Sequence, residues 1–263
     1  MHQKHRICIL VKAYPQPSQK YEETVCCAGI TEDGRLLRLY PIPYRRLKKE
    51  QQFQRFDWVE MDIAKDTSDH RPESHKVVPD SIRIVQLSSA LKPEQKVRLW
   101  KPFIADSLQT LKEENVKTGR SLGIIKPDPD TVKFSAKPIR EASAEDQALT
   151  NNLYRQASLL DTEPLKELQK PELTFEYHFT SAGHTHEMKI HDWEVAAAYY
   201  QYKKRYGDKT LEMLSNEYGN NIPRQNLHII LGTMKAHPRQ FIIIGLLRTT
   251  EDINLADAQQ TLL

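Results

Sequence analysis

The residues of this sequence best suited to binding chemistry form a basic, aromatic segment between Arg35 and Phe56. Seven Lys and Arg residues stand there against one acid, Glu50, so the local charge is +6 in a chain that totals +3. Four aromatic residues lie among them: Tyr40, Tyr44, Phe53 and Phe56. Clustered cations neutralise phosphates and exposed rings stack on bases, so this mixture favours single-stranded nucleic acid as a ligand.

Two roles are expected within and beside this segment. Phosphate contacts are predicted for Lys12, Arg38, Arg45, Arg46, Lys48 and Lys49, and base stacking for Tyr40 and Tyr44. A solvated helix beside a β domain, with its aromatic residues buried, is the structural alternative for the same composition.

A histidine cluster is the second candidate site. His184 and His186 stand two positions apart on an expected strand, so they point to the same face and could share a divalent metal. His191 or Asp192 could supply a third ligand and give a hydrolytic metal site. The spacing matches no defined metal motif, and the sequence has no HExxH, so exposed histidines in a polar hairpin remain the alternative.

A third candidate is the loop around Arg71 and Glu73, which also contains Asp69 and His75. Charge-assisted hydrogen bonds from such a loop could orient a base or a phosphate. An Arg–Glu pair that simply fixes the loop explains the same residues.

The elements that would position these residues begin with a β-rich region, residues 1–91. Apolar or alternating stretches predict strands over 6–13, 24–31, 36–40, 56–63 and 81–87. Asp33-Gly34 between two of them is a strong hairpin signal. Short strands joined by polar turns favour a small barrel or sandwich.

The rest of the chain mixes helices and strands, so the predicted class is α+β. Residues 92–165 are expected to form a helical connector, with one helix from Pro93 that bends or splits at Pro102 and another beginning near Ser143. Residues 166–263 are expected to form a second domain with two hairpins around a helix pair, followed by a polar tail or a terminal helix.

Composition excludes several other classes. No run approaches the ~20 apolar residues of a membrane span, and no cleavable secretory signal follows the N-terminus. Three cysteines without CxxC spacing fit a reducing cytoplasm. Only nine glycines and no P-loop or GxSxG motif disfavour phosphate-loop and serine-hydrolase chemistry. The chain is therefore expected to be cytoplasmic, with no membrane partner.

Short motifs resemble the dual OB-fold family of prokaryotic conflict systems. Cys27-Ala28-Gly29-Ile30 and Leu37-Arg38-Leu39-Tyr40-Pro41 are similar to that family's C-x-A-G strand and G-x-W-I-R-P element. Arg71-Pro72-Glu73-Ser74 resembles its Q-P-E-N element, Leu231-Gly232 with Phe241–Ile244 its closing hairpin, and Met188–Trp193 its T-D-P-x-W turn. Leu37, Arg71 and Ser74 depart from the pattern, and no Pro follows Asp192.

The resemblance implies two OB-like barrels, a nucleic-acid role in defence or in mobile elements, and a place for Arg38 and Glu73 near the first barrel's binding face. The leading hypothesis is a non-enzymatic, nucleic-acid-binding protein without a cofactor. One alternative is a metal-dependent nuclease or hydrolase that uses His184, His186 and His191. The other is an adaptor that binds a protein partner encoded nearby.

Overall fold

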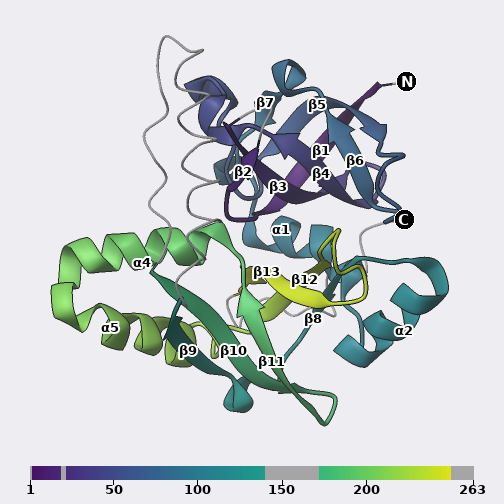
Figure 1. The fold of residues 1–263 in the computed structure, drawn as a ribbon. Coiled ribbons are helices and arrows are strands. Elements are labelled where there is room, and N and C mark those ends of the chain that lie inside the picture. Colours follow the sequence, from purple (N-terminus) through teal and green to yellow (C-terminus); the bar gives the residue numbers. More distant parts are fainter. Residues whose placement is uncertain (1, 19–21, 140–171, 250–263) are drawn as a thin grey trace.

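The first domain is a closed five-stranded barrel in the computed structural model, which describes residues 2–18, 22–139 and 172–249 (Figure 1). The strand order of its sheet is β1-β3-β4-β6-β5, and the barrel closes because β1 pairs with β5 as well as with β3. Only β4 and β6 run parallel among these pairs. The barrel strands are β1 (Gln3–Lys12), β3 (Glu22–Thr31), β4 (Leu36–Ile42), β5 (Trp58–Lys65) and β6 (Ser74–Val77).

Alternation of side chains explains how the barrel fills its interior. Along β5, Val59, Met61 and Ile63 are buried and point inward, while the residues between them are partly exposed. The predicted hairpin is confirmed: β3 and β4 pair around a turn in which Gly34 has φ +78°, a conformation that favours glycine. Short strands β2 (Gln16–Ser18) and β7 (Arg83–Gln86) extend the sheet from β3 and β5.

The connections within and after the barrel are short helical turns. Between β4 and β5 lie η1 (Tyr44–Arg46) and η2 (Lys49–Gln51), and η3 (Pro79–Ser81) and η4 (Ser88–Ala90) flank β7. Two α-helices follow, α1 (Pro93–Trp100) and α2 (Leu108–Thr118), separated by η5 (Lys101–Phe103). The predicted split at Pro102 is confirmed, because the proline lies inside η5, where α1 has ended.

The second domain is a six-stranded sheet with a helix pair. Its order is β8-β12-β13-β11-β10-β9, and β11 and β13 form its parallel pair. The strands are β8 (Leu122–Ile125), β9 (Lys133–Pro138), β10 (Leu173–Ser181), β11 (His184–Ile190), β12 (His228–Thr233) and β13 (Phe241–Leu247). The helices are α4 (Trp193–Tyr206) and α5 (Thr210–Asn216), with η6 (Pro129–Thr131), η7 (Gly207–Lys209) and the π-helix η8 (Glu217–Asn221).

The prediction of a helical connector over 92–165 was wrong for the described residues 122–138, which contain two strands. Strands β8 and β9 belong to the second sheet, where they pair with β12 and β10. The sequence did not show this because β8 has four buried residues, too few to display a period. The helix expected near Ser143 lies outside the described residues, as does the tail after 249.

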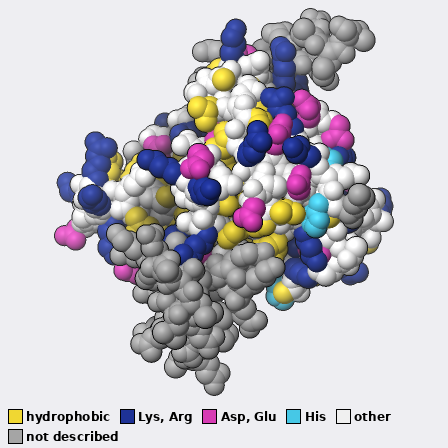
Figure 2. Space-filling view, turned by 90° about the horizontal axis from the view of Figure 1, so that it is seen from above, with side chains coloured by type: hydrophobic (Ala, Val, Ile, Leu, Met, Phe, Trp, Pro, Cys, Tyr) yellow, Lys and Arg dark blue, Asp and Glu magenta, His cyan; other side chains and the backbone are white. Residues whose placement is uncertain are grey.

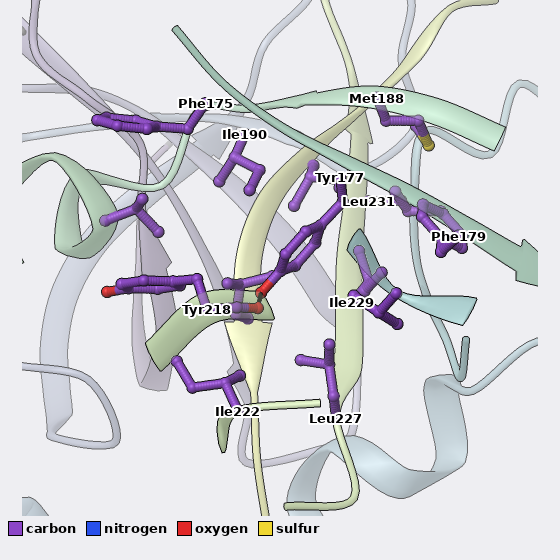
Figure 3. Close-up of a cluster of buried hydrophobic side chains, with 14 of the residues drawn as sticks. Phe175, Tyr177, Phe179, Met188, Ile190, Tyr218, Ile222, Leu227, Ile229 and Leu231 are labelled. Atoms are coloured by element: carbon purple, nitrogen blue, oxygen red, sulfur yellow. Dashed lines mark hydrogen bonds between the residues drawn. The ribbon is translucent and has the colours of Figure 1, made fainter. Parts of the chain in front are cut away.

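Aromatic and aliphatic side chains from the strands and helices of the second domain fill a second hydrophobic core (Figure 3). Tyr177 lies fully buried in it and donates its hydroxyl hydrogen to the carbonyl of Tyr218 at 2.8 Å. This bond satisfies the one polar atom of the Tyr177 ring and links β10 to η8. Burying this hydroxyl therefore costs little free energy of folding.

A third apolar cluster joins the two domains. It combines barrel residues such as Leu10, Val11 and Ile30 with Trp100 of α1 and Ile244 of β13. Trp100 is almost completely buried there and packs beside the ring of His228. Barrel and second sheet thus meet across a continuous apolar interface, with α1 between them (Figure 1).

The predicted α+β class is confirmed, with a small barrel, a second small β domain and a helix pair. The barrel's pairing order is compatible with an OB-fold. Within the described ranges, no helix is both long and apolar enough to cross a bilayer.

Candidate functional site

A cavity of about 640 Å³ lies between the barrel and the β12–β13 hairpin of the second domain. Strands β3 and β4 contribute Cys26, Ala28, Arg38 and Tyr40 to its lining. Two barrel loops contribute further lining residues, the segment after β1, with Tyr14, and the loop before β6, with Asp66 and Arg71, and β6 itself contributes His75 and Lys76. The opposite wall comes from Thr233, Met234, Lys235, Ile242, Ile244 and His191.

Arg38 is the most unusual residue of this cavity. It is only 6 % exposed, yet no carboxylate of the described residues pairs with its guanidinium. Nη2 donates to the carbonyl and hydroxyl oxygens of Ser121 at 3.3 and 3.4 Å, and Nη1 lies 3.7 Å from the sulfur of Cys26. Its Nε has no partner within the described residues. A buried charge in this state is costly unless something else compensates it.

Arg71, in contrast, is compensated within the cavity wall. Its Nε and Nη2 donate to both carboxylate oxygens of Asp69, and Nη1 donates to the carbonyl of Thr233 at 2.5 Å. Partial burial acts to raise the pKa of Asp69, but hydrogen bonds from Arg71 and Ser74 outweigh it and hold that pKa well below its usual range. The predicted pinned loop is therefore real, but Asp69 replaces Glu73 as the partner of Arg71.

Glu73 holds the start of β8. Its carboxylate accepts hydrogen bonds from the backbone N–H of Ser121 at 2.8 Å and from the Ser121 hydroxyl at 2.7 Å. The N–H of Leu122 also donates to it at 3.3 Å. Glu73 thereby fixes the same serine that contacts Arg38, so its role here is to position the residues around the guanidinium.

The rim of the cavity is polar and aromatic. Tyr40 is 44 % exposed, and its hydroxyl oxygen accepts a hydrogen bond from Thr24 at 3.2 Å. Lys76 pairs with Asp66 at 3.2 Å. Burial lowers the pKa of His75, whose Nδ1 lies 2.8 Å from the carbonyl of Glu73. The rim thus offers an accessible ring beside cationic groups.

Two families divide the chain at the point where barrel and second domain meet. Residues 3–102 match a domain of unknown function, DUF8758, and residues 104–262, more than half of the chain, match another, DUF8757. The chain belongs to the DUF8757 family. A search of curated proteins finds no match. The cavity lies between the DUF8758 region, which supplies Arg38 and Tyr40, and the DUF8757 region, which supplies the hairpin wall.

The basic segment predicted from the sequence does not stay together in the DUF8758 region. Arg35 pairs with Asp33, Arg45 with the buried Glu23, and Arg55 with Asp192 of the DUF8757 region. Arg38 enters the cavity, Arg46 is partly buried, and Lys48 and Lys49 remain exposed. Seen from the barrel side, Lys and Arg side chains lie interspersed with Asp and Glu (Figure 2).

Lys12 and Tyr44 lie at the domain interface, away from the cavity lining. The Lys12 ammonium donates to the Tyr44 hydroxyl at 3.1 Å and lies 5.6 Å from the ring centre of Trp193 in the DUF8757 region. Burial lowers the pKa of Lys12 and raises that of Tyr44 to about 12. Tyr44 packs edge-on against Phe53 and Trp193. These positions suit a structural link between the domains better than phosphate contact or base stacking.

The structure does not bring His184, His186 and His191 together as metal ligands. His184 is exposed, His186 packs against the ring of Phe179, and His191 lies beyond the end of β11 and faces the cavity. Within the described residues, the group whose ligand atoms lie within 4.8 Å of one another is Glu176, His178 and Glu187.

That acidic group is already occupied by a cation from the chain itself. The Lys137 ammonium lies 2.5 Å from a carboxylate oxygen of Glu176 and 2.8 Å from one of Glu187. Because the Lys137 ammonium pairs with both carboxylates and lies where a metal would, the group gives no support to a divalent metal site.

Sequence reasoning missed the part of the site that comes from the DUF8757 region. Ser121 and Thr233 contact Arg38 and Arg71, and Met234 and Lys235 complete the hairpin wall. The motif resemblance predicted the β12–β13 hairpin as an element of the fold, but nothing in the sequence indicates that this hairpin faces the barrel.

Proposed function

We propose that this chain binds single-stranded nucleic acid on the barrel face formed by β3 and β4. The observation that carries the proposal is the position of the cavity. Counted along the chain, β3 and β4 are the second and third of the five barrel strands, and the cavity is flanked by the loops that follow the first strand, β1, and the fourth, β5. OB barrels bind oligonucleotides or oligosaccharides on this strand face and between these loops.

The chemistry of the lining favours nucleic acid over saccharide. Arg38, Arg71, Lys76 and Lys235 outnumber Asp66 and Asp69 among the lining residues, so the cavity attracts anions. Tyr40 provides an exposed ring on the same face, suited to stack on a base. A role in a prokaryotic defence or mobile-element system stays a prediction that depends on the resemblance alone.

The test is a fluorescence anisotropy titration of the purified chain with single- and double-stranded DNA and RNA oligomers at several salt concentrations. Single strands are expected to bind, with log affinity falling linearly in log salt by about 0.7 per neutralised phosphate. Tyr40→Ala is expected to weaken binding at least fivefold, since stacking contributes ~1–3 kcal/mol per base. Tyr206→Ala, on α4 and outside the cavity lining, is the matched control.

Binding to no oligomer, or binding that is independent of salt, contradicts the proposal. Affinity for a protein partner that survives nuclease treatment, in the absence of any oligomer binding, would favour the adaptor alternative.

A further inference from the structure

We infer that the cavity receives a single phosphorylated nucleotide, with its phosphomonoester group bound at Arg38. This inference rests on the proposed function and specifies its ligand. The phosphomonoester has two sources, a free nucleotide or the phosphorylated end of a strand, and both present the same chemistry to the cavity.

The size of the cavity limits what can enter it. OB-folds that bind strands along an open groove cover roughly 4–16 nucleotides. Here the β12–β13 hairpin stands opposite the corresponding face, and the space that remains measures about 640 Å³. That volume lies within the ~300–1,000 Å³ typical of small-molecule sites. It is large enough for one nucleotide.

The charge of Arg38 identifies the part of the nucleotide that binds deepest. Two other arginines at this domain junction each pair with a carboxylate: the buried Arg71 with Asp69, and the partly buried Arg55 with Asp192. Arg38 has none within the described residues, although it is 94 % buried, and its Nε lacks a partner there. The planar guanidinium binds phosphate through paired N–H donors, so a phosphate would supply the missing negative charge.

The acid that binds the same serine does not meet this need. The carboxylate of Glu73 is engaged by the N–H groups of Ser121 and Leu122 and by the Ser121 hydroxyl. Asp66 and Asp69 are paired with Lys76 and Arg71. The acids of the cavity are therefore committed, and two cations of the lining remain, the buried Arg38 and the exposed Lys235.

The surplus favours a terminal phosphate over an internal one. A phosphomonoester carries a charge of about −1.5 to −2 near pH 7, whereas a phosphodiester within a strand carries one negative charge. A buried, unpaired guanidinium discriminates between them more strongly than an exposed lysine does, because screening by water is weaker inside the protein.

The apolar walls suit the remainder of the nucleotide. Val11, Ala28, Pro41, Ile242 and Ile244 line the cavity, and Tyr40 stands at its rim. Small-molecule sites combine such apolar walls with a few convergent polar groups. A base and a sugar would contact the walls while the phosphate binds Arg38.

The experiment is isothermal titration calorimetry of the full chain with nucleoside 5′-monophosphates, the matching nucleosides and inorganic phosphate. A second arm uses one single-stranded oligomer with a phosphate at the 5′ end, at the 3′ end or at neither. In at least one arm, the phosphorylated ligand is expected to bind tenfold tighter than its unphosphorylated counterpart and than inorganic phosphate. A preference among free nucleotides identifies one source, and a preference among oligomers the other.

Two variants test the assigned position. Arg38→Met is expected to abolish the tenfold preference, and Met234→Trp, a substitution in the hairpin loop, is expected to block the cavity while leaving Arg38 intact. Arg98→Met, an exposed arginine of α1, is the matched control. Thermal unfolding of each variant shows whether it is folded.

Some results overturn the inference while the proposed function stands. One such result is that oligomers bind equally well with and without an end phosphate while nucleoside monophosphates do not bind. Another is that the preference for the phosphorylated ligand persists in folded Arg38→Met and Met234→Trp. Equal binding of inorganic phosphate and nucleotides also overturns it, since the site would then recognise only an anion. Absence of binding to every oligomer and nucleotide contradicts the proposed function itself.

Discussion

Arg55 offers the sharpest test of how the two domains are held together. Its Nη2 lies 3.0 Å from a carboxylate oxygen of Asp192 and 3.0 Å from one of Glu194, and its Nη1 donates to the carbonyl of Leu246. Asp192 is only 3 % exposed, so this ion pair between barrel and second domain is largely removed from water. We predict that Arg55→Met destabilises the chain strongly.

The expected magnitude follows from what the substitution leaves behind. Breaking a buried pair by removing one partner costs about 3–5 kcal/mol, because the other charge stays buried without compensation. Asp192 keeps two backbone donors, the N–H of Glu194 at 2.9 Å and that of Leu246 at 3.2 Å. The loss should therefore lie at the lower end, about 3 kcal/mol, which corresponds to a fall in Tm of about 6–12 °C.

Equilibrium urea unfolding followed by tryptophan fluorescence measures this loss, and Trp193 beside Asp192 reports on the interface. Arg35→Met is the control, since Arg35 and its partner Asp33 are exposed and the substitution should leave the free energy of unfolding nearly unchanged. Adding Asp192→Asn to Arg55→Met should recover part of the loss and give a coupling energy of about 2 kcal/mol.

A loss below 1 kcal/mol in Arg55→Met, or one equal to that in Arg35→Met, would refute the reasoning. It would mean that Asp192 reaches solvent or another cation, so that the pair does not hold the domains together.

Two further predictions concern the cores. Burial lowers the pKa of His228 to about 4, whereas an unfolded His titrates near pH 6.5, so the unfolded chain takes up this proton first as the pH falls. The free energy of unfolding, measured by urea titration at each pH, should therefore drop by up to about 3 kcal/mol between pH 6.5 and 4. His228→Gln should remove that part of the pH dependence. If the free energy of unfolding of His228→Gln fell with pH as steeply as that of the unchanged chain, His228 would not be its source. Gly29→Ala should cost about 1–3 kcal/mol in the same assay, because the added Cβ would lie 2.8 Å from the carbonyl oxygen of Cys8. Gly219→Ala, whose Cβ would meet nothing closer than 3.5 Å, is its control, and an equal effect of both substitutions would argue against the close approach.

Local patterns were enough to predict most of the barrel. The strands β1, β3, β4, β5 and β7 carry apolar runs or alternation that a sequence displays directly. Strand β6 was read as a loop because its four residues show no period, although it closes the barrel beside β4. A strand this short is specified by its neighbours and not by its own pattern.

The site was less predictable, because long-range partners decide what each charge does. Arg38, Tyr40 and Arg71 line the cavity, as a binding role requires. Arg45 and Arg55 belong to the same basic segment, but Glu23 and Asp192 neutralise them from distant parts of the sequence. The local charge of +6 therefore overstated the cationic surface, and the informative feature was Arg38, a buried arginine with which no acid of the described residues pairs.

The apolar cluster around Trp100 has a consequence for how the chain can vary. Its members come from both sides of the boundary near residue 103 where the two family matches meet. Expressed alone, either part would present a face of Ile, Leu and Val to water and would be prone to aggregate. The two regions of this chain therefore depend on each other, and a change of side-chain volume on one side of this boundary should require a compensating change on the other.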